Sequence, residues 1–431
     1  MQEATVVEGA GTRAIVTIGA LYFIIGFVTW LNGPLISFVG LAFTLDDVGA
    51  FLIPLVFYLS YFFLSLPASW IMNRIGMKRG LALSLFVMAI GTAIFGQFAT
   101  MRSYPGALAG LFVIGGGLSL LQTAINPYIS ILGPIESAAR RIAMMGICNK
   151  VAGILAPIVL GALVLHGMGD LSQRVAAAAD PAARAALLDR FAGAIYVPYM
   201  TMAVILLLSA IWIARSSLPE IVPDRNNASA ADVGGALPRA PHLWLGVLCL
   251  FLYVGVEVMA GDAIGTYGRG FGLPLDQTKF FTSFTLGAML VGYLLGLLLI
   301  PRVVSQERYL AGSAGLGIVL SLAAMMTTGY AAVACVALLG IANAMMWPTI
   351  FPLAIKGLGR QTGAGSALLI MGVSGGAIVP QLFVHLKLHH DFQTVFTLLM
   401  APCYLYIMLY ALFGYRAGMS TGVRQGLAQG V

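Results

Sequence analysis

Three ionisable side chains fall inside long apolar segments of this sequence, where a charge is costly. They are Lys150, Glu257 and Asp262. Such a group at membrane depth costs about 2.5–3.5 kcal/mol or more, so it usually faces a polar cavity or a partner. We predict that Glu257 binds a solute or carries a coupling cation, with Lys150 as its candidate charge partner and Asp262 as a further coupling group. A structural ion pair, or a Lys150 that snorkels toward water, is the alternative.

Glu257 and Asp262 occupy one apolar segment, five positions apart. An unbroken helix points side chains at that spacing in different directions, because only residues three or four apart share a face. A break at Gly261 would change their relative orientation, and broken helices are common at transporter sites. The backbone at Gly261 therefore decides whether the two carboxylates face the same space.

Amides and aromatic rings form a second set of candidate residues inside the other apolar segments. An amide offers both a donor and an acceptor, as a hydroxyl group does, and aromatic faces suit the C–H face of a pyranose. A neutral polyol needs such a site, whereas an anion would need more than one buried cation. The predicted substrate-binding residues are Asn32, Gln122, Asn126, Asn149, Glu257, Asn343 and Trp347. For any one amide, the alternative is a hydrogen bond between helices, worth about 0.6 kcal/mol.

The elements that must position these residues are membrane-spanning helices. The chain has 431 residues, of which 60% are hydrophobic and only 9% are charged, whereas soluble domains have about 25% charged residues. Twelve apolar runs are long enough to cross the bilayer at roughly 20 residues each. All should be helical, because backbone groups in lipid must be satisfied within the segment. The sequence predicts an all-α integral membrane protein in the lipid bilayer.

Basic residues set the expected orientation. Most lysines and arginines fall in loops on the side of the N-terminus, which places both termini in the cytoplasm by the positive-inside rule. We expect a multi-pass protein of a bacterial inner membrane. The net charge of +7 is scattered between apolar runs, so it does not indicate a nucleic-acid partner.

The two halves of the chain look related. Asn126-Pro127-Tyr128 is matched by Trp347-Pro348-Thr349, and Ile154–Gly161 is matched by Ala377–Val384 at a similar offset. We predict two pseudo-symmetric six-helix bundles with a site between them. The predicted divisions are residues 1–214 for the first bundle, 215–241 for a cytoplasmic linker, and 242–431 for the second bundle and a short tail.

Catalytic motifs are not found in the sequence. No nucleophile–base motif is present, and the glycine clusters lack the Gly-Lys-Ser/Thr that a phosphate loop requires. We therefore expect no enzyme activity, no cofactor and no metal site. A monomer is expected.

Several longer motifs resemble a known family. The basic loop Asn73–Arg79 after the second apolar run resembles that of the major facilitator superfamily. Leu120–Pro134, Arg141–Pro157, Tyr253–Val258 and Trp347–Gly359 resemble the fucose/galactose/glucose–cation symporter family. The resemblance implies a site between two bundles that opens alternately to either side, and a carboxylate that couples a sugar to a proton or a sodium ion.

Two N-terminal carboxylates of that family are missing from this chain. Family members often have Asp where this chain has Gly33, and the fucose branch has Glu where it has Gln122. The resemblance therefore shifts the expected coupling role to Glu257, Asp262 and Lys150.

Three short motifs are more similar to the N-acetylglucosamine permease branch of bacteria. They are Trp30–Leu35, Gly146–Lys150 and Val256–Asp262. We predict a secondary active transporter of a hexose or N-acetylhexosamine, with N-acetylglucosamine favoured and a proton as the coupling ion. A passive sugar facilitator or a sodium-coupled glucose/galactose symporter is the alternative.

Overall fold

The computed structural model describes residues 12–131, 138–216, 218, 240–300, 302–358 and 361–418. In this part of the chain the regular structure is helical and contains no strand. Twelve helical segments in it are long and apolar enough to cross a membrane. The predicted all-α, twelve-span architecture is confirmed.

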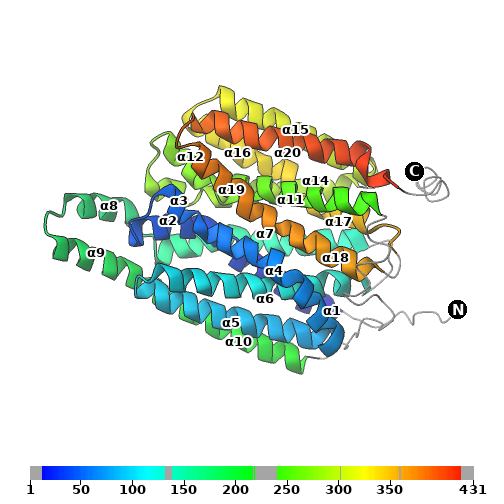
Figure 1. Cartoon of the computed structure of the whole chain (residues 1–431), viewed down its shortest axis with the longest axis horizontal. Helices are drawn as coiled ribbons and strands as arrows, with labels where there is room; N and C mark the ends of the chain where they lie inside the picture. Colours follow the sequence, from blue (N-terminus) through cyan, green and yellow to red (C-terminus); the bar gives the residue numbers. More distant parts are fainter. Residues whose placement is uncertain are drawn as a thin grey trace.

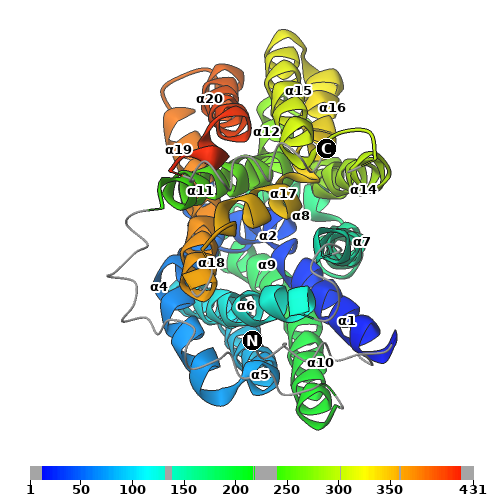
Figure 2. The same cartoon turned by 90° about the vertical axis from the view of Figure 1, so that its right-hand side faces the viewer.

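The spans form two bundles of six, one from each half of the chain. The N-terminal bundle contains α1 (Thr12–Thr29), α2 (Asn32–Ala42), α4 (Leu52–Ile75), α5 (Met77–Thr100), α6 (Tyr104–Ile131), α7 (Ala138–Leu163) and α10 (Tyr196–Arg215). The C-terminal bundle contains α11 (Pro241–Gly261), α12 (Ile264–Gly270), α14 (Phe281–Leu299), α15 (Gln306–Met326), α16 (Gly329–Asn343), α17 (Met346–Ile355), α18 (Thr362–Met371), η5 (Gly372–Ser374), α19 (Gly375–Leu386) and α20 (Phe392–Leu412). The bundles meet mainly where α7 packs on α14 and where α4 packs on α18 and α19 (Figure 2).

The two ends of the molecule differ. The start of α1 and the end of α20 lie at one end, which we call the termini end (Figure 1). Two short helices, α8 (Met168–Ala177) and α9 (Pro181–Gly193), project from the opposite end, which we call the α8–α9 end. The alanine-rich sequence of Asp170–Gly193 predicts one short helix lying on the outer surface. The structure has two because Asp180 caps a new helix at Pro181, accepting hydrogen bonds from the next two backbone amides.

Short breaks interrupt corresponding spans of the two bundles. Span one breaks between α1 and α2, at Trp30–Leu31, and span seven breaks between α11 and α12, at Asp262–Ala263. Carbonyl groups freed by the second break are satisfied from α14: Thr282 donates to Gly261 O at 2.8 Å, and Thr285 donates to Ala260 O at 2.7 Å. Irregular backbone is tolerated at membrane depth where the protein satisfies it in this way.

Close contacts within each bundle depend on glycine. A Cβ atom on Gly375 would overlap the carbonyl oxygen of Phe251 on α11, which is backbone and cannot move aside. We expect Gly375→Ala to lower the free energy of unfolding by about 1–3 kcal/mol, because overpacking forces the helices apart. Gly312→Ala on α15 is the matched control, since its Cβ would meet nothing within 4 Å. Thermal unfolding in detergent measures both; equal stability of the two variants would contradict this packing.

Candidate binding site between the bundles

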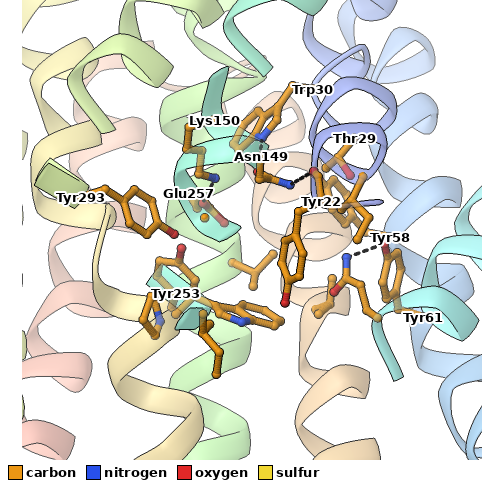
Figure 3. A pocket seen from close by; sticks show the side chains of 18 residues that line it. Tyr22, Thr29, Trp30, Tyr58, Tyr61, Asn149, Lys150, Tyr253, Glu257 and Tyr293 are labelled. Carbon is orange, nitrogen blue, oxygen red and sulfur yellow. Dashed lines mark hydrogen bonds and ion pairs between the residues drawn. The ribbon is translucent and has the colours of Figure 1, made fainter. Parts of the chain in front are cut away.

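A pocket lies between the two bundles and is lined by residues of both of them (Figure 3). We call it the central pocket. Its aromatic and polar lining residues are Tyr22, Thr29, Trp30, Tyr58, Tyr61, Gln122, Asn149, Lys150, Tyr253, Glu257, Tyr293 and Trp347.

An ion pair joins the two bundles inside the central pocket. Lys150 Nζ on α7 lies 2.9 Å from Glu257 Oε1 on α11, and the two side chains are only 6% and 12% exposed. The ammonium group also lies 4.4 Å from the centroid of the Trp30 ring, a distance at which cation–π attraction operates. Lys150 therefore does not snorkel to the surface. The pair places two opposite charges in the pocket, and these charges cancel each other.

Two glycines on α7 make room for the rings around this pair. A Cβ atom on Gly146 would lie 2.6 Å from the Tyr293 ring, and one on Gly153 would lie 2.5 Å from the Trp30 ring. Both distances are too short for a real side chain. The sequence of α7 thus lets an aromatic group from each bundle pack beside Lys150.

Amide groups hold other parts of the wall. Asn149 accepts from Trp30 Nε1 at 3.4 Å and donates to the Tyr22 carbonyl at 3.5 Å, while Gln122 Nε2 donates to the Tyr61 hydroxyl at 3.2 Å. Each amide therefore contacts an aromatic residue that also lines the pocket. The result is a cavity with rings for its walls and amides, hydroxyls and one ion pair as its polar groups.

The structure separates the predicted site residues into two sets. Those that line the central pocket are Gln122, Asn149, Lys150, Glu257 and Trp347. Asn32, Asn343 and Asp262 are buried and do not line it. The side chain of Asn126 lies outside the described residues.

Asn32 and Asn343 contact hydroxyl groups instead. Asn32 lies beside the Tyr58 hydroxyl, and Asn343 Oδ1 accepts from Tyr404 at 2.8 Å. Span ten breaks just after Asn343, and its amide faces α20 rather than the pocket.

Four tyrosines that line the pocket were not predicted from the sequence: Tyr22, Tyr58, Tyr61 and Tyr293. Tyr58 and Tyr61 are three residues apart and share a helix face, which was the available signal. Nothing in the sequence distinguishes Tyr22 or Tyr293 from tyrosines that pack between helices.

The bundles are also tied together at the α8–α9 end. Asp47, in the short helix α3 (Asp47–Ala50), forms ion pairs with Arg269 at 2.9 Å and with Lys387. Arg269 also donates to Ser37 Oγ at 3.2 Å, and the buried Lys279 donates to the Leu165 carbonyl at 2.7 Å. Each contact joins a residue of one bundle to a residue of the other. The α8–α9 end is therefore closed in this conformation.

Known proteins resemble this chain in sequence and in architecture. The family model described as Major Facilitator Superfamily matches residues 18–380. A glucose/galactose transporter of Brucella abortus is 33% identical over 407 residues, covering 94% of each chain. An L-fucose-proton symporter of Escherichia coli is 29% identical, covering 91% of each chain. The match covers both bundles and the pocket residues between them.

Solved structures agree with the sequence comparison. A crystal structure of the major facilitator superfamily transporter FucP in the outward conformation superposes with a TM-score of 0.77 at 28% identity, covering 94% of this chain and 99% of that one. A D-xylose-proton symporter, at 15% identity and a TM-score of 0.64, shares the fold. These relatives are membrane transporters, not enzymes. The chain belongs to the major facilitator superfamily, in the branch that contains the glucose/galactose and fucose–proton transporters.

Proposed function

We propose that this protein is a secondary active sugar transporter that moves a neutral hexose together with a proton by alternating access. The observation that carries the proposal is the Lys150–Glu257 ion pair, which joins the bundles inside an aromatic pocket. A sugar hydroxyl can donate to a carboxylate and accept from an ammonium group at once. A sugar can therefore enter between the two partners, and its binding changes a contact that holds the bundles together.

The central pocket suits a pyranose in its other groups too. Trp30 and Trp347 offer ring faces, while Gln122 and Asn149 offer amide donors and acceptors. We assign direct sugar contact to these residues and to Glu257. Asn32 supports the wall through Tyr58, whereas Asn343 bonds to Tyr404, which does not line the pocket. Sugar must bind the two conformations with different affinity, because only differential binding shifts such an equilibrium.

Glu257 and Lys150 are the proposed coupling residues of the pocket itself. The pair already neutralises both charges without a bound ion, which also suits a passive facilitator. Proton-driven accumulation of sugar distinguishes a symporter from a passive facilitator. Relatives named for proton symport support the proton over the sodium ion.

Experiment must identify which sugar is transported. Relatives are named for glucose, galactose and L-fucose, and no comparison supports the N-acetylglucosamine that the short motifs favour. We place the termini end in the cytoplasm, the linker at residues 215–241 between domains 1–214 and 242–431, and the protein in an inner membrane as a monomer.

Uptake into proteoliposomes tests this function. The purified protein should accumulate at least one of four radiolabelled sugars, namely D-glucose, D-galactose, L-fucose and N-acetylglucosamine, when the lumen is alkaline to the bath. A protonophore should collapse the gradient of sugar. Accumulation that follows a sodium gradient instead would favour sodium symport, and equilibration without accumulation would favour a facilitator. Failure to transport any sugar would contradict the proposal.

Trp347 should contribute to sugar affinity. We expect Trp347→Ala to raise the KM for uptake about three- to tenfold, because aromatic contacts contribute about 0.5–1.5 kcal/mol beyond buried area. Trp212→Ala on α10 is the matched control, since Trp212 is exposed on the outer surface of the bundle and does not line the pocket. Equal KM values for the two variants would remove Trp347 from the site.

A further inference from the structure

Asp262 is buried in the contact between the bundles but outside the central pocket. Asp262 lies in the break between α11 and α12, and it is only 2% exposed. By strict geometry neither carboxyl oxygen accepts a hydrogen bond from the described residues, although the Gly33 backbone amide and the Tyr58 hydroxyl approach the group. A buried carboxylate that is poorly hydrogen-bonded is far more costly than the neutral acid. Burial at this position therefore favours the neutral form of Asp262.

The surface that covers Asp262 comes from the other bundle. A Cβ atom on Gly33 of α2 would lie 3.2 Å from Asp262 Oδ1 and 2.6 Å from Thr282 Oγ1. The carboxyl group thus packs on α2 at Gly33, and a side chain at that position would press on both this group and the Thr282 hydroxyl. Thr282 does not serve as its donor, because that hydroxyl already donates to the Gly261 carbonyl.

The contact continues from Asp262 to the α8–α9 end. On α2 it runs from Gly33 to Ser37, and on α12 it runs to Arg269, which contacts both Ser37 and Asp47. When the bundles separate at this end, α2 leaves α12 and Asp262 meets water. On the proposed orientation, that water is outside the cell.

Two rings that line the central pocket lie beside the Gly261–Asp262 segment. Trp30 packs against Gly261, and the Tyr58 hydroxyl approaches the Asp262 carboxyl group. Movement of these two rings would expose the carboxyl group to the pocket.

Within the described part of the chain, few charged or titratable groups act on Asp262. They are Glu257 on its own helix, Lys150 on α7 and Tyr58 on α4. Gly33 on α2 and Thr282 on α14 do not titrate. Lys150 is already paired with Glu257, so it does not supply a free cation for a second carboxylate.

We propose that Asp262 is a proton-binding site, separate from the sugar pocket, whose protonation permits α2 and α12 to close at the α8–α9 end. Rising pH should open this end, because the charged carboxylate resists burial. The inference names the proton site of the proposed symporter. The two groups then have separate roles. The charged pair Lys150–Glu257 contacts the sugar, and Asp262 binds the proton where α2 and α12 close.

Thiol labelling tests the closing step without sugar. Ser37→Cys, in a chain whose four native cysteines are alanine, places a buried thiol on α2 beside Arg269. Its rate of reaction with a hydrophilic maleimide is divided by that of Ala185→Cys, an exposed position on α9, to cancel the pH dependence of the thiol. The ratio should rise with pH, by up to about tenfold per unit for one proton. A ratio that is flat or falls with pH overturns the proposal, whatever any variant at 262 does.

Asp262→Asn, which mimics the neutral acid, gives the second readout. Its labelling ratio should stay low at every pH, and proteoliposomes should exchange labelled for unlabelled sugar but lose proton-driven accumulation. Retained accumulation, or a pH dependence equal to that of Asp262, would overturn the proposal. Exchange also reports that the variant is folded. A rising ratio in a protein that transports no sugar would instead refute the proposed function and leave the proton site standing.

Discussion

Replacing Lys150 with methionine should abolish sugar accumulation and lower the free energy of unfolding by about 3–5 kcal/mol. The reason is the Glu257 carboxylate, which is 12% exposed and would lose the ammonium group 2.9 Å away. Removing one partner of a buried pair leaves an uncompensated charge, which costs about that much. Thermal unfolding in detergent and uptake into proteoliposomes measure the two effects.

The double variant Lys150→Met with Glu257→Gln separates stability from transport. Without either charge, the protein should regain most of the lost stability, because neither replacement carries a charge that must be desolvated. It should still fail to accumulate sugar. A single variant as stable as the unmodified protein would show that the pair does not bury charge, and a double variant with full accumulation would remove the pair from coupling.

Replacing Asp47 with asparagine should open the α8–α9 end. The carboxylate pairs with both Arg269 and Lys387 of the other bundle, and partly exposed pairs contribute up to about 1 kcal/mol each. The labelling ratio of Ser37→Cys should therefore rise by up to about thirtyfold. High salt should also raise this ratio in the protein that keeps Asp47, but by less, because salt only screens the ion pairs.

Asp46→Asn is the matched control for this gate. Asp46 is adjacent in sequence but caps α3 within its own bundle, accepting from Gly49 N at 2.8 Å. Its replacement should leave the ratio unchanged. Equal labelling of the Asp46 and Asp47 variants would mean that the ion pairs do not hold the α8–α9 end closed.

The fold was predictable because the bilayer imposes one rule on every span. Apolar length predicts the helices, and the repeat of Pro127 and Pro157 at Pro348 and Pro380 indicates the two bundles. The same rule made Lys150 and Glu257 stand out, since a charge at that depth needs a reason.

The composition of the pocket was less predictable because it depends on rotation about helix axes. Asn343 and Trp347 are four residues apart, yet the span breaks between them, so Trp347 faces the pocket and Asn343 faces Tyr404. Asp262 was predicted to couple, but its burial against Gly33 of the other bundle depends on a contact between distant parts of the chain. Such cross-bundle contacts have no local signature in the sequence.

The decisive measurement is a structure determined with the best-transported of the four sugars. We expect one sugar in the central pocket, stacked on Trp30 or Trp347 and hydrogen-bonded to Glu257, with Lys150 in contact with the sugar or with Glu257. A sugar bound elsewhere while the Lys150–Glu257 pair stays intact would contradict this expectation.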